Sequence, residues 1–300
     1  MTLVIGSVQL GLIYGLLALG IYISFRILNI PDLTADGSFT LGLSISAVLT
    51  VAGHPYLGIL LAVIAGAAAG MATGFFQTRL GINPILAGIL TMSSLYSVNL
   101  FILGSRSNLS LIGSDSIFNQ MTALMPENKE AAKTIVPFII CFLCAVLVIW
   151  FFKTHLGLCI RATGNNEDMV RASSINVNAM KIIALAISNA CIGLSGAVLA
   201  QYQGYADISS GIGMVVVGLA SAIIGEGVFG RRSVTTGLVS AVFGSLIYRF
   251  IIAAALKSSI FPAYALRIVS AVIVIIALAL PVIKRDIQFS RMRKKAQRNA

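Results

Sequence analysis

Two carboxylates, Asp32 and Asp36, interrupt an apolar stretch near the start of the chain, in the sequence IPDLTADGSF at residues 30–39. Pro31 and Gly37 accompany them, and both residue types disfavour a continuous helix. Membrane transporters place binding sites where a helix is broken and its backbone is exposed. Ionised groups at membrane depth usually face a cavity. The competing interpretation is a plain turn between two apolar segments, and these residues alone favour that turn.

Other polar side chains lie within later apolar runs: Thr91, Ser93, Ser94, Asn99, Asn189, Gln201, Glu226 and Arg249. Serine and asparagine at such positions often only hydrogen-bond one helix to another. Glu226 lies near the end of its run. We therefore expect it to cap a helix or to pair with Arg231, rather than to relay protons.

The polar loop 153–181 has the features of a short capped helix. Asn165 can cap the helix start, and the acidic residues Glu167 and Asp168 follow in the first turn, where they interact favourably with the helix dipole. Asn176 can adopt the left-handed conformation that ends such a helix. An apolar stripe follows along one side of the expected helix: Met169, Ala172 and Ile175.

A short helix outside the bilayer has little of its own chain to pack against. One interpretation is that the apolar stripe docks into a groove on a partner protein. The other is that the helix lies on the membrane surface. The spacing of the residues leaves both interpretations open.

Several catalytic classes lack their motifs in this chain. The sequence contains no Gly-Lys pair, so it cannot hold ATP in the manner of a P-loop. Its two histidines, His54 and His155, lie at the ends of apolar runs on opposite sides of the expected membrane. We therefore expect no catalysis, no metal site and no bound cofactor. We expect the four cysteines to be small buried apolar residues: Cys141, Cys144, Cys159 and Cys191.

The elements that must position these residues are membrane-spanning helices. The chain has 300 residues, of which 58% are hydrophobic and 10% charged, which is too little polar surface for a soluble domain. The apolar runs are continuous rather than alternating, which favours helices over a barrel. We expect an all-α, polytopic bundle with about 9–10 spans in a single transmembrane domain, residues 1–300. The nine runs are Leu3–Phe25, Phe39–Gly53, Leu57–Phe76, Ile85–Leu103, Ile135–Phe152, Ile182–Tyr202, Ile212–Phe229, Val234–Ala254 and Ala263–Ile283.

The second run is short and follows the polar insert, so we expect a half-helix with re-entrant backbone there. If residues 27–38 hide an extra crossing, the count is ten. Basic residues concentrate in the 153–181 loop and in the tail, residues 285–300. Because cytoplasmic loops are enriched in Lys and Arg, we place both segments in the cytoplasm. Alternation then places the N-terminus outside. The net charge is +11, and the basic residues lie between and after the spans. This position indicates contact with anionic lipid rather than binding of nucleic acid.

Four stretches resemble the permease subunits of bacterial ABC importers for branched-chain amino acids, ribose and related solutes. They are GLIYGLLALGIYISFRILNIPDLTADGSFTLG (11–42), NPILAGILTM (83–92), LGLCIRATGNNEDMVRASSINV (156–177) and GLSGAVLAQYQGYADISSGIGMVVVGLASAIIGEGVFGRRS (193–233). The 156–177 stretch is the most specific, because residue order and spacing hold along it.

The resemblance implies an importer in the bacterial inner membrane. Its partners would be two cytosolic ATPase subunits that bind ATP and magnesium, a second permease copy, and an extracytoplasmic binding protein. The solute would be an amino acid, with an aromatic one suggested by NIPDLTADGSF. The alternatives are ribose or another small sugar or nucleoside, and an ion-coupled secondary transporter.

The resemblance also implies two sets of site residues. A coupling helix would contact the ATPase through Asn165, Asn166, Glu167, Asp168, Met169, Arg171, Ala172 and Ile175. A translocation path would be lined by Asp32, Thr34, Asp36, Ser38, Asn83, Thr91 and Asn189.

Overall fold

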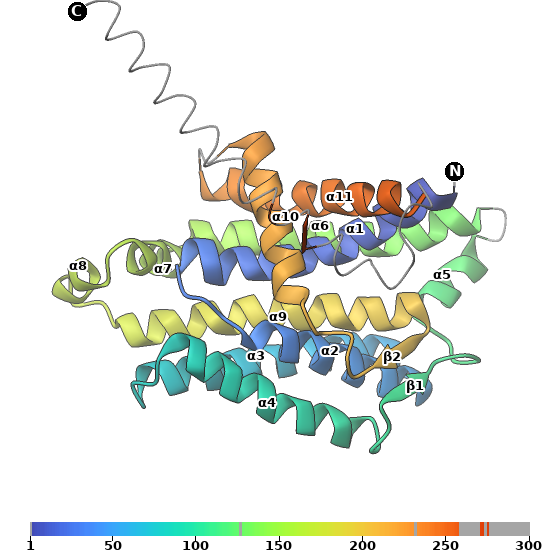
Figure 1. Cartoon of the computed structure of the whole chain (residues 1–300), viewed down its shortest axis with the longest axis horizontal. Helices are drawn as coiled ribbons and strands as arrows, with labels where there is room; N and C mark the ends of the chain where they lie inside the picture. Colours follow the sequence, from blue (N-terminus) through green and yellow to red (C-terminus); the bar gives the residue numbers. More distant parts are fainter. Residues whose placement is uncertain (1, 126–127, 231–232, 258–270, 273–274, 276–300) are drawn as a thin grey trace, which may run out of the picture.

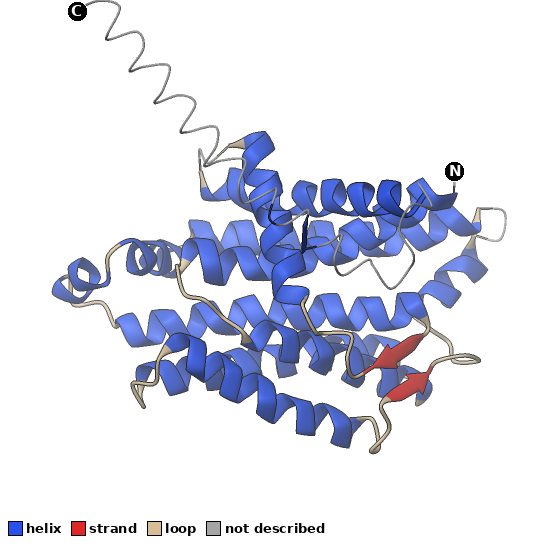
Figure 2. Ribbon diagram, viewed as in Figure 1, coloured by secondary structure: helices blue, strands red, loops and turns tan. Residues whose placement is uncertain are grey.

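The computed structural model describes residues 2–125, 128–230, 233–257, 271–272 and 275. Long helices run along one axis, with a two-stranded sheet at one end of the bundle (Figures 1 and 2). The strands β1 (Asn108–Ser110) and β2 (Tyr205–Asp207) pair antiparallel. The helices are α1 (Thr2–Ile21), η1 (Tyr22–Ile27), α2 (Thr34–Val51), α3 (Pro55–Thr78), α4 (Pro84–Ile102), α5 (Ile117–Leu124), α6 (Lys129–Lys153), α7 (His155–Asn165), α8 (Glu167–Ala172), α9 (Val177–Gln203), α10 (Met214–Phe229) and α11 (Val234–Lys257).

The expected all-α, polytopic architecture is confirmed. Among the described residues, 7 helices are long and apolar enough to cross a membrane, and α10 is a shorter apolar helix. The first eight predicted runs each coincide with a helix. The ninth, Ala263–Ile283, lies outside the described residues apart from positions 271–272 and 275, and the basic tail 285–300 lies outside them altogether.

The N-terminus and the loop helices α7 and α8 lie at opposite ends of the bundle (Figure 1). At the loop end, Gly164 of α7 packs so closely on the Ile27 carbonyl of η1 that a Cβ would not fit. At the other end, Gln9 of α1 donates a hydrogen bond to Thr134 near the start of α6, with 2.9 Å between the two polar atoms. This arrangement agrees with the alternation expected from the sequence.

Helix α9 is the central element of the bundle. It has 27 residues, which corresponds to a length of about 40 Å, and it packs against α1, α2 and α3. Small residues permit the close approach: Gly42 of α2 lies directly against the backbone of Gly193, and Gly66 of α3 against that of Asn189. Glycine at helix contacts is the usual packing device inside membranes.

Two helices, α2 and α10, follow non-helical backbone that lies within the bundle. Residues 28–33 have no regular structure and lead into α2 at Thr34. Residues 208–213 lead from β2 into α10. The second run is longer than the expected half-helix, because α2 has 18 residues and starts within the polar insert; the expected non-helical backbone lies before it, at residues 28–33. The extra crossing considered within residues 27–38 is wrong, since only this short connection lies between η1 and α2.

Candidate functional site

Asp32 lies about midway along the bundle, in the connection before α2. Its carboxylate accepts a hydrogen bond from Asn189 Nδ2 of α9 at 2.7 Å and another from the backbone N–H of Thr34 at 2.9 Å. Both Asp32 and Asn189 are fully buried. Asn189 is the thirteenth residue of α9, about 18 Å from the start of that helix, which gives the depth of this pair.

Hydroxyl groups continue this polar cluster toward α4. Thr34 of α2 shares a hydrogen bond with Thr73 of α3 at 2.7 Å, and Thr73 donates to Thr91 of α4 at 3.0 Å. Ser38 is also fully buried, on the next turn of α2. The structure therefore brings together most of the residues expected to line a path, but it packs them between helices. The clustered residues Asp32, Thr34, Ser38, Thr91 and Asn189 line neither of the two cavities described below, whereas Asp36 does line one.

Asp36 binds the start of α10. Its carboxylate oxygens accept hydrogen bonds from the backbone N–H groups of Gly213 at 2.9 Å and Val215 at 2.8 Å. These donors are free at the first turn of any helix, where the dipole also favours a negative charge. The chain reaches this point through Gly213 with a positive φ of 86°, which glycine adopts without strain.

Asp36 also lines a cavity of about 380 Å³, here called the α4 cavity. Met92, Ser93 and Tyr96 of α4 form one wall, and Gly211 and Ile212 form another.

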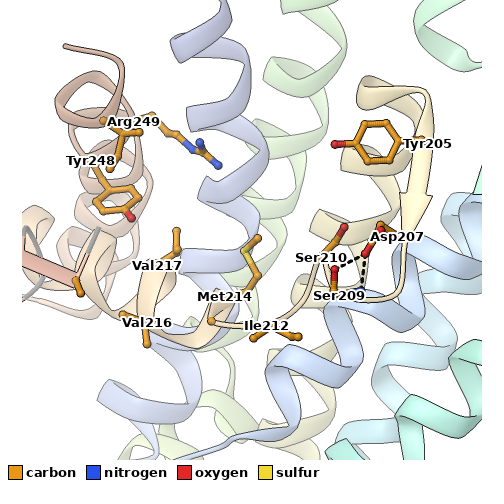
Figure 3. Close-up of a pocket in the computed structure, with 13 residues that line it drawn as sticks. Tyr205, Asp207, Ser209, Ser210, Ile212, Met214, Val216, Val217, Tyr248 and Arg249 are labelled. Carbon is orange, nitrogen blue, oxygen red and sulfur yellow. Dashed lines mark hydrogen bonds between the residues drawn. The ribbon is translucent and has the colours of Figure 1, made fainter. Parts of the chain in front are cut away.

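A second cavity, of about 630 Å³, lies on the other side of the 208–213 segment and is here called the α11 cavity. Ile212 lines both cavities. Figure 3 shows Tyr205, Asp207, Ser209 and Ser210 on one side of it, and Tyr248 and Arg249 of α11 on the other. Sequence reasoning noted Arg249 without assigning it a role and missed the other residues. The available signal was an isolated basic residue in an apolar run.

Asp207 is held in its ionised form. The Ser209 hydroxyl and backbone N–H both donate to its Oδ1, the backbone N–H at 2.7 Å. The hydrogen bond from the Ser209 side chain lowers the pKa of Asp207 below its usual range. A negative charge therefore lines the α11 cavity at neutral pH.

The expected coupling residues lie on α8 and beside it. The helix is capped by Asn166, whose Oδ1 accepts from the Met169 backbone at 3.0 Å. The expectation that Asn165 is the cap is wrong, because Asn165 is the last residue of α7. Helix α8 ends at Ala172, so Ile175 lies beyond it.

The end of α8 also differs from expectation. Ser174, with φ of 60°, adopts the left-handed conformation. Asn176 instead caps α9, accepting from the Ala179 backbone at 3.1 Å.

The outward surface of α8 is exposed. Val170 turns inward and is 1% exposed, whereas Met169 is 55% exposed. The remaining coupling residues are exposed or partly exposed: Asn165, Asn166, Glu167, Asp168, Arg171, Ala172 and Ile175. Glu167 forms an ion pair with Lys181 of α9, at 2.6 Å, which ties α8 to the central helix.

Two further residues have local partners. Asn83 is exposed and caps α4, accepting from the Ile85 backbone at 3.0 Å, so it lies apart from the Asp32 cluster. Glu226 forms an ion pair with Arg26 at 2.5 Å. The expected partner Arg231 lies outside the described residues.

Spanning helices joined by non-helical segments within the bundle are common in membrane transport proteins. The chain belongs to the family described as "Branched-chain amino acid transport system / permease component", which it matches over residues 3–278. It is thus a multi-pass permease subunit of an ABC importer, a class in which the permease component works with a separate ATPase and a binding protein.

Three relatives illustrate the range of named substrates. The chain is 36% identical to a tyrosine transport system permease protein of Clostridioides difficile, over 92% of this chain and 90% of the relative. It is 30% identical to the D-allose transport system permease of Escherichia coli, over 77% and 69%. It is 26% identical to the ribose import permease of Escherichia coli, over 70% and 61%. No solved structure matches the chain significantly.

Proposed function

We propose that this permease imports an amino acid with an aromatic side chain. The tyrosine permease relative supports this substrate, because its similarity extends over most of both chains. The α11 cavity also supports it, since a positive and a negative side chain both line it. The runner-up is a small sugar, which the names of the allose and ribose relatives favour. The match to the ABC permease family favours an ATP-driven importer over the ion-coupled secondary transporter that the sequence left as an alternative.

Helix α8 is the element that couples transport to ATP hydrolysis in this proposal. The observation that carries it is the exposed α7–α8 segment, which extends beyond the bundle at one end (Figure 1) and is tied to α9 by the Glu167–Lys181 pair. Two ATPase subunits would each hold one α8 in a surface groove, as helices with an apolar stripe commonly dock. ATP and magnesium would bind to the ATPase, and this chain would bind neither.

The proposal includes a specific assembly and orientation. Two copies of this chain form the pore in the bacterial inner membrane. The α8 end and the C-terminus face the cytoplasm, and a binding protein delivers solute at the β1–β2 end. When the ATPases bind ATP and close, they bind one state of the permease bundle more tightly than the other. This difference in affinity shifts the bundle between its two states.

The test is uptake by proteoliposomes that contain the permease, its ATPase and its binding protein. Radiolabelled L-tyrosine should accumulate only with ATP inside, and accumulation should persist when an ionophore collapses ion gradients. Labelled ribose serves as the comparison. Uptake of ribose without tyrosine would overturn the proposed substrate, and uptake that survives removal of the ATPase would overturn the mechanism.

A further inference from the structure

Arg249 brings a cation into the α11 cavity from a membrane-spanning helix. Its Nε is buried and has no hydrogen-bond partner. The ion pairs found in the described part of the chain are Arg26–Glu226 and Lys181–Glu167, and neither includes Arg249. A charged side chain within a membrane bundle is costly, and it usually marks a functional site. Arg249 therefore places a cation without a carboxylate partner among the described residues at the wall of the cavity, where an anionic group of a ligand can meet it.

Tyr14 holds the Arg249 side chain in place. The guanidinium carbon lies 3.9 Å from the centroid of the Tyr14 ring, and that ring stacks in turn on Phe39, at 6.4 Å and 14°. A cation over an aromatic face is attracted by the ring. The contact restrains the position of the guanidinium, whose N–H donors all lie in one plane. A fixed planar fork of this kind matches a carboxylate with two parallel hydrogen bonds.

The opposite side of the cavity carries the complementary charge. Asp207 lies there with Ser209 and Ser210 (Figure 3). The Arg249 guanidinium and the Tyr205 hydroxyl point into the space between the two sides (Figure 3). Apolar side chains, including Met214, Val217 and Ile252, line the remainder. The cavity volume of about 630 Å³ is within the range of small-molecule sites.

We propose that the α11 cavity binds the transported solute as a zwitterionic amino acid, an inference that rests on the proposed function. Arg249 binds the α-carboxylate, Asp207 supplies the negative charge that favours the ammonium group, and the apolar lining receives the side chain. A neutral sugar carries no charge, so it forms no ionic interaction with Arg249 or Asp207. The site therefore selects amino acids over sugars within the membrane subunit itself.

The experiment measures ligand binding to the permease–ATPase complex in lipid nanodiscs without the binding protein. The probes are L-tyrosine, tyramine, which lacks the carboxylate, and 3-(4-hydroxyphenyl)propionate, which lacks the ammonium group. The unmodified complex should bind tyrosine about tenfold or more tightly than either analogue, the difference typical of one hydrogen bond to a charged group. Arg249→Gln should abolish the preference over tyramine, and Arg249→Lys should retain part of it.

A second variant tests the other wall independently. Asp207 is partly exposed on β2, and its carboxylate accepts hydrogen bonds from the neighbouring Ser209 and from Asn108 of β1 rather than from a helix, so Asp207→Asn should leave the bundle intact. It should abolish the preference over 3-(4-hydroxyphenyl)propionate and keep the preference over tyramine. Arg106→Gln, which removes an exposed arginine near β1, is the matched control and should change neither. Co-purification with the ATPase confirms that each variant assembles.

The outcomes separate this inference from the proposed function. If the unmodified complex shows no preference for tyrosine over its analogues, or if both Arg249→Gln and Asp207→Asn keep those preferences, the site assignment is wrong. Tyrosine uptake by the unmodified importer in proteoliposomes would then still support the proposed function. If the unmodified importer takes up ribose and no amino acid, both proposals fail together.

Discussion

Asp36 and the amides it binds are 177 and 179 residues apart in the chain, at Gly213 and Val215. The carboxylate acts as the cap of α10, although it belongs to α2. Replacing a capping side chain typically costs about 1 kcal/mol, and here the lost charge also faces the helix dipole. Asp36 therefore fixes where α10 begins, and with it the 208–213 segment between the two cavities.

We expect Asp36→Asn to reduce tyrosine uptake by up to about fivefold, the factor that corresponds to a lost cap, while the ATPase still co-purifies. The substitution keeps the shape of the side chain but removes its charge and one of the two oxygens that accept from the Gly213 and Val215 amides. Uptake by proteoliposomes and the recovered ATPase are the two measurements. Asp115→Asn, at an exposed loop position, is the control. Uptake by Asp36→Asn at the unmodified rate would restore the interpretation of a plain structural turn.

The ionisation of Asp207 leads to a prediction about pH. Hydrogen bonding to Ser209 lowers its pKa below the usual value of about 3.9. A carboxylate with a lowered folded pKa contributes its full interaction above the unfolded value and loses it only as the pH falls through the folded value. We therefore expect tyrosine affinity to show no Asp207-dependent step between about pH 5 and pH 8.

The measurement is the tyrosine dissociation constant across that pH range, with Asp207→Asn as the reference. The dissociation constant should depend on pH in the same way for the unmodified protein and for the variant, with weaker binding by the variant at every pH. A step that is present in the unmodified protein and absent in the variant would contradict an ionised Asp207.

Sequence reasoning identified many of the polar residues but not their partners. Asp32 and Asp36 stood out because carboxylates are rare in apolar sequence. Their roles depend on Asn189, 157 residues away, and on the amides that begin α10. Spacing along one helix gives no information on such pairs, because they depend on which helices are neighbours. Asp207 and Ser209 were missed for a different reason, since an isolated Asp in a connecting loop looks like any solvated charge.

At the scale of elements, the long helices were predictable and their ends were not. Continuous apolar runs predict spans, because the bilayer leaves the backbone few alternatives. The predicted start of the loop helix was displaced by one residue, because Asn165 and Asn166 are both good caps and the choice depends on how α7 ends. The start of α10 could not be predicted either, since its cap comes from α2.

Helix α8 carries the prediction about coupling. We expect Met169→Glu, and likewise Ala172→Glu, to abolish ATP-driven uptake and to reduce recovery of the ATPase in parallel. Both residues lie on the exposed face of α8, and a charge there would have to be desolvated in an apolar groove. The measurements are uptake, ATPase co-purification and the amount of permease in the membrane.

The matched control for α8 is Ile112→Glu, which introduces the same charge at a residue that is 92% exposed, in the loop between β1 and α5. It should leave ATPase recovery unchanged. Normal co-purification by the Met169 and Ala172 variants would remove the docking role from α8.

At the scale of the whole molecule, the proposed pore requires a second copy of the chain. Exposed apolar side chains cover much of α3, α4 and α6, and lipid or a second copy can cover such faces. We expect the mass of the purified complex, measured by native mass spectrometry, to correspond to two permeases and two ATPases. A complex with one permease would contradict the proposed assembly.

The ion pair between Glu167 and Lys181 has a consequence that extends through the whole bundle. It joins the exposed loop helix to the first turns of α9, and α9 then continues without a break past Asn189 to the residues that precede β2. A displacement of α8 would therefore be transmitted along α9 as one continuous helix. Helix α9 ends directly before β2, which carries Tyr205 and Asp207. A movement of α8 on one side of the membrane therefore changes the shape of the α11 cavity near the other side while α9 stays folded.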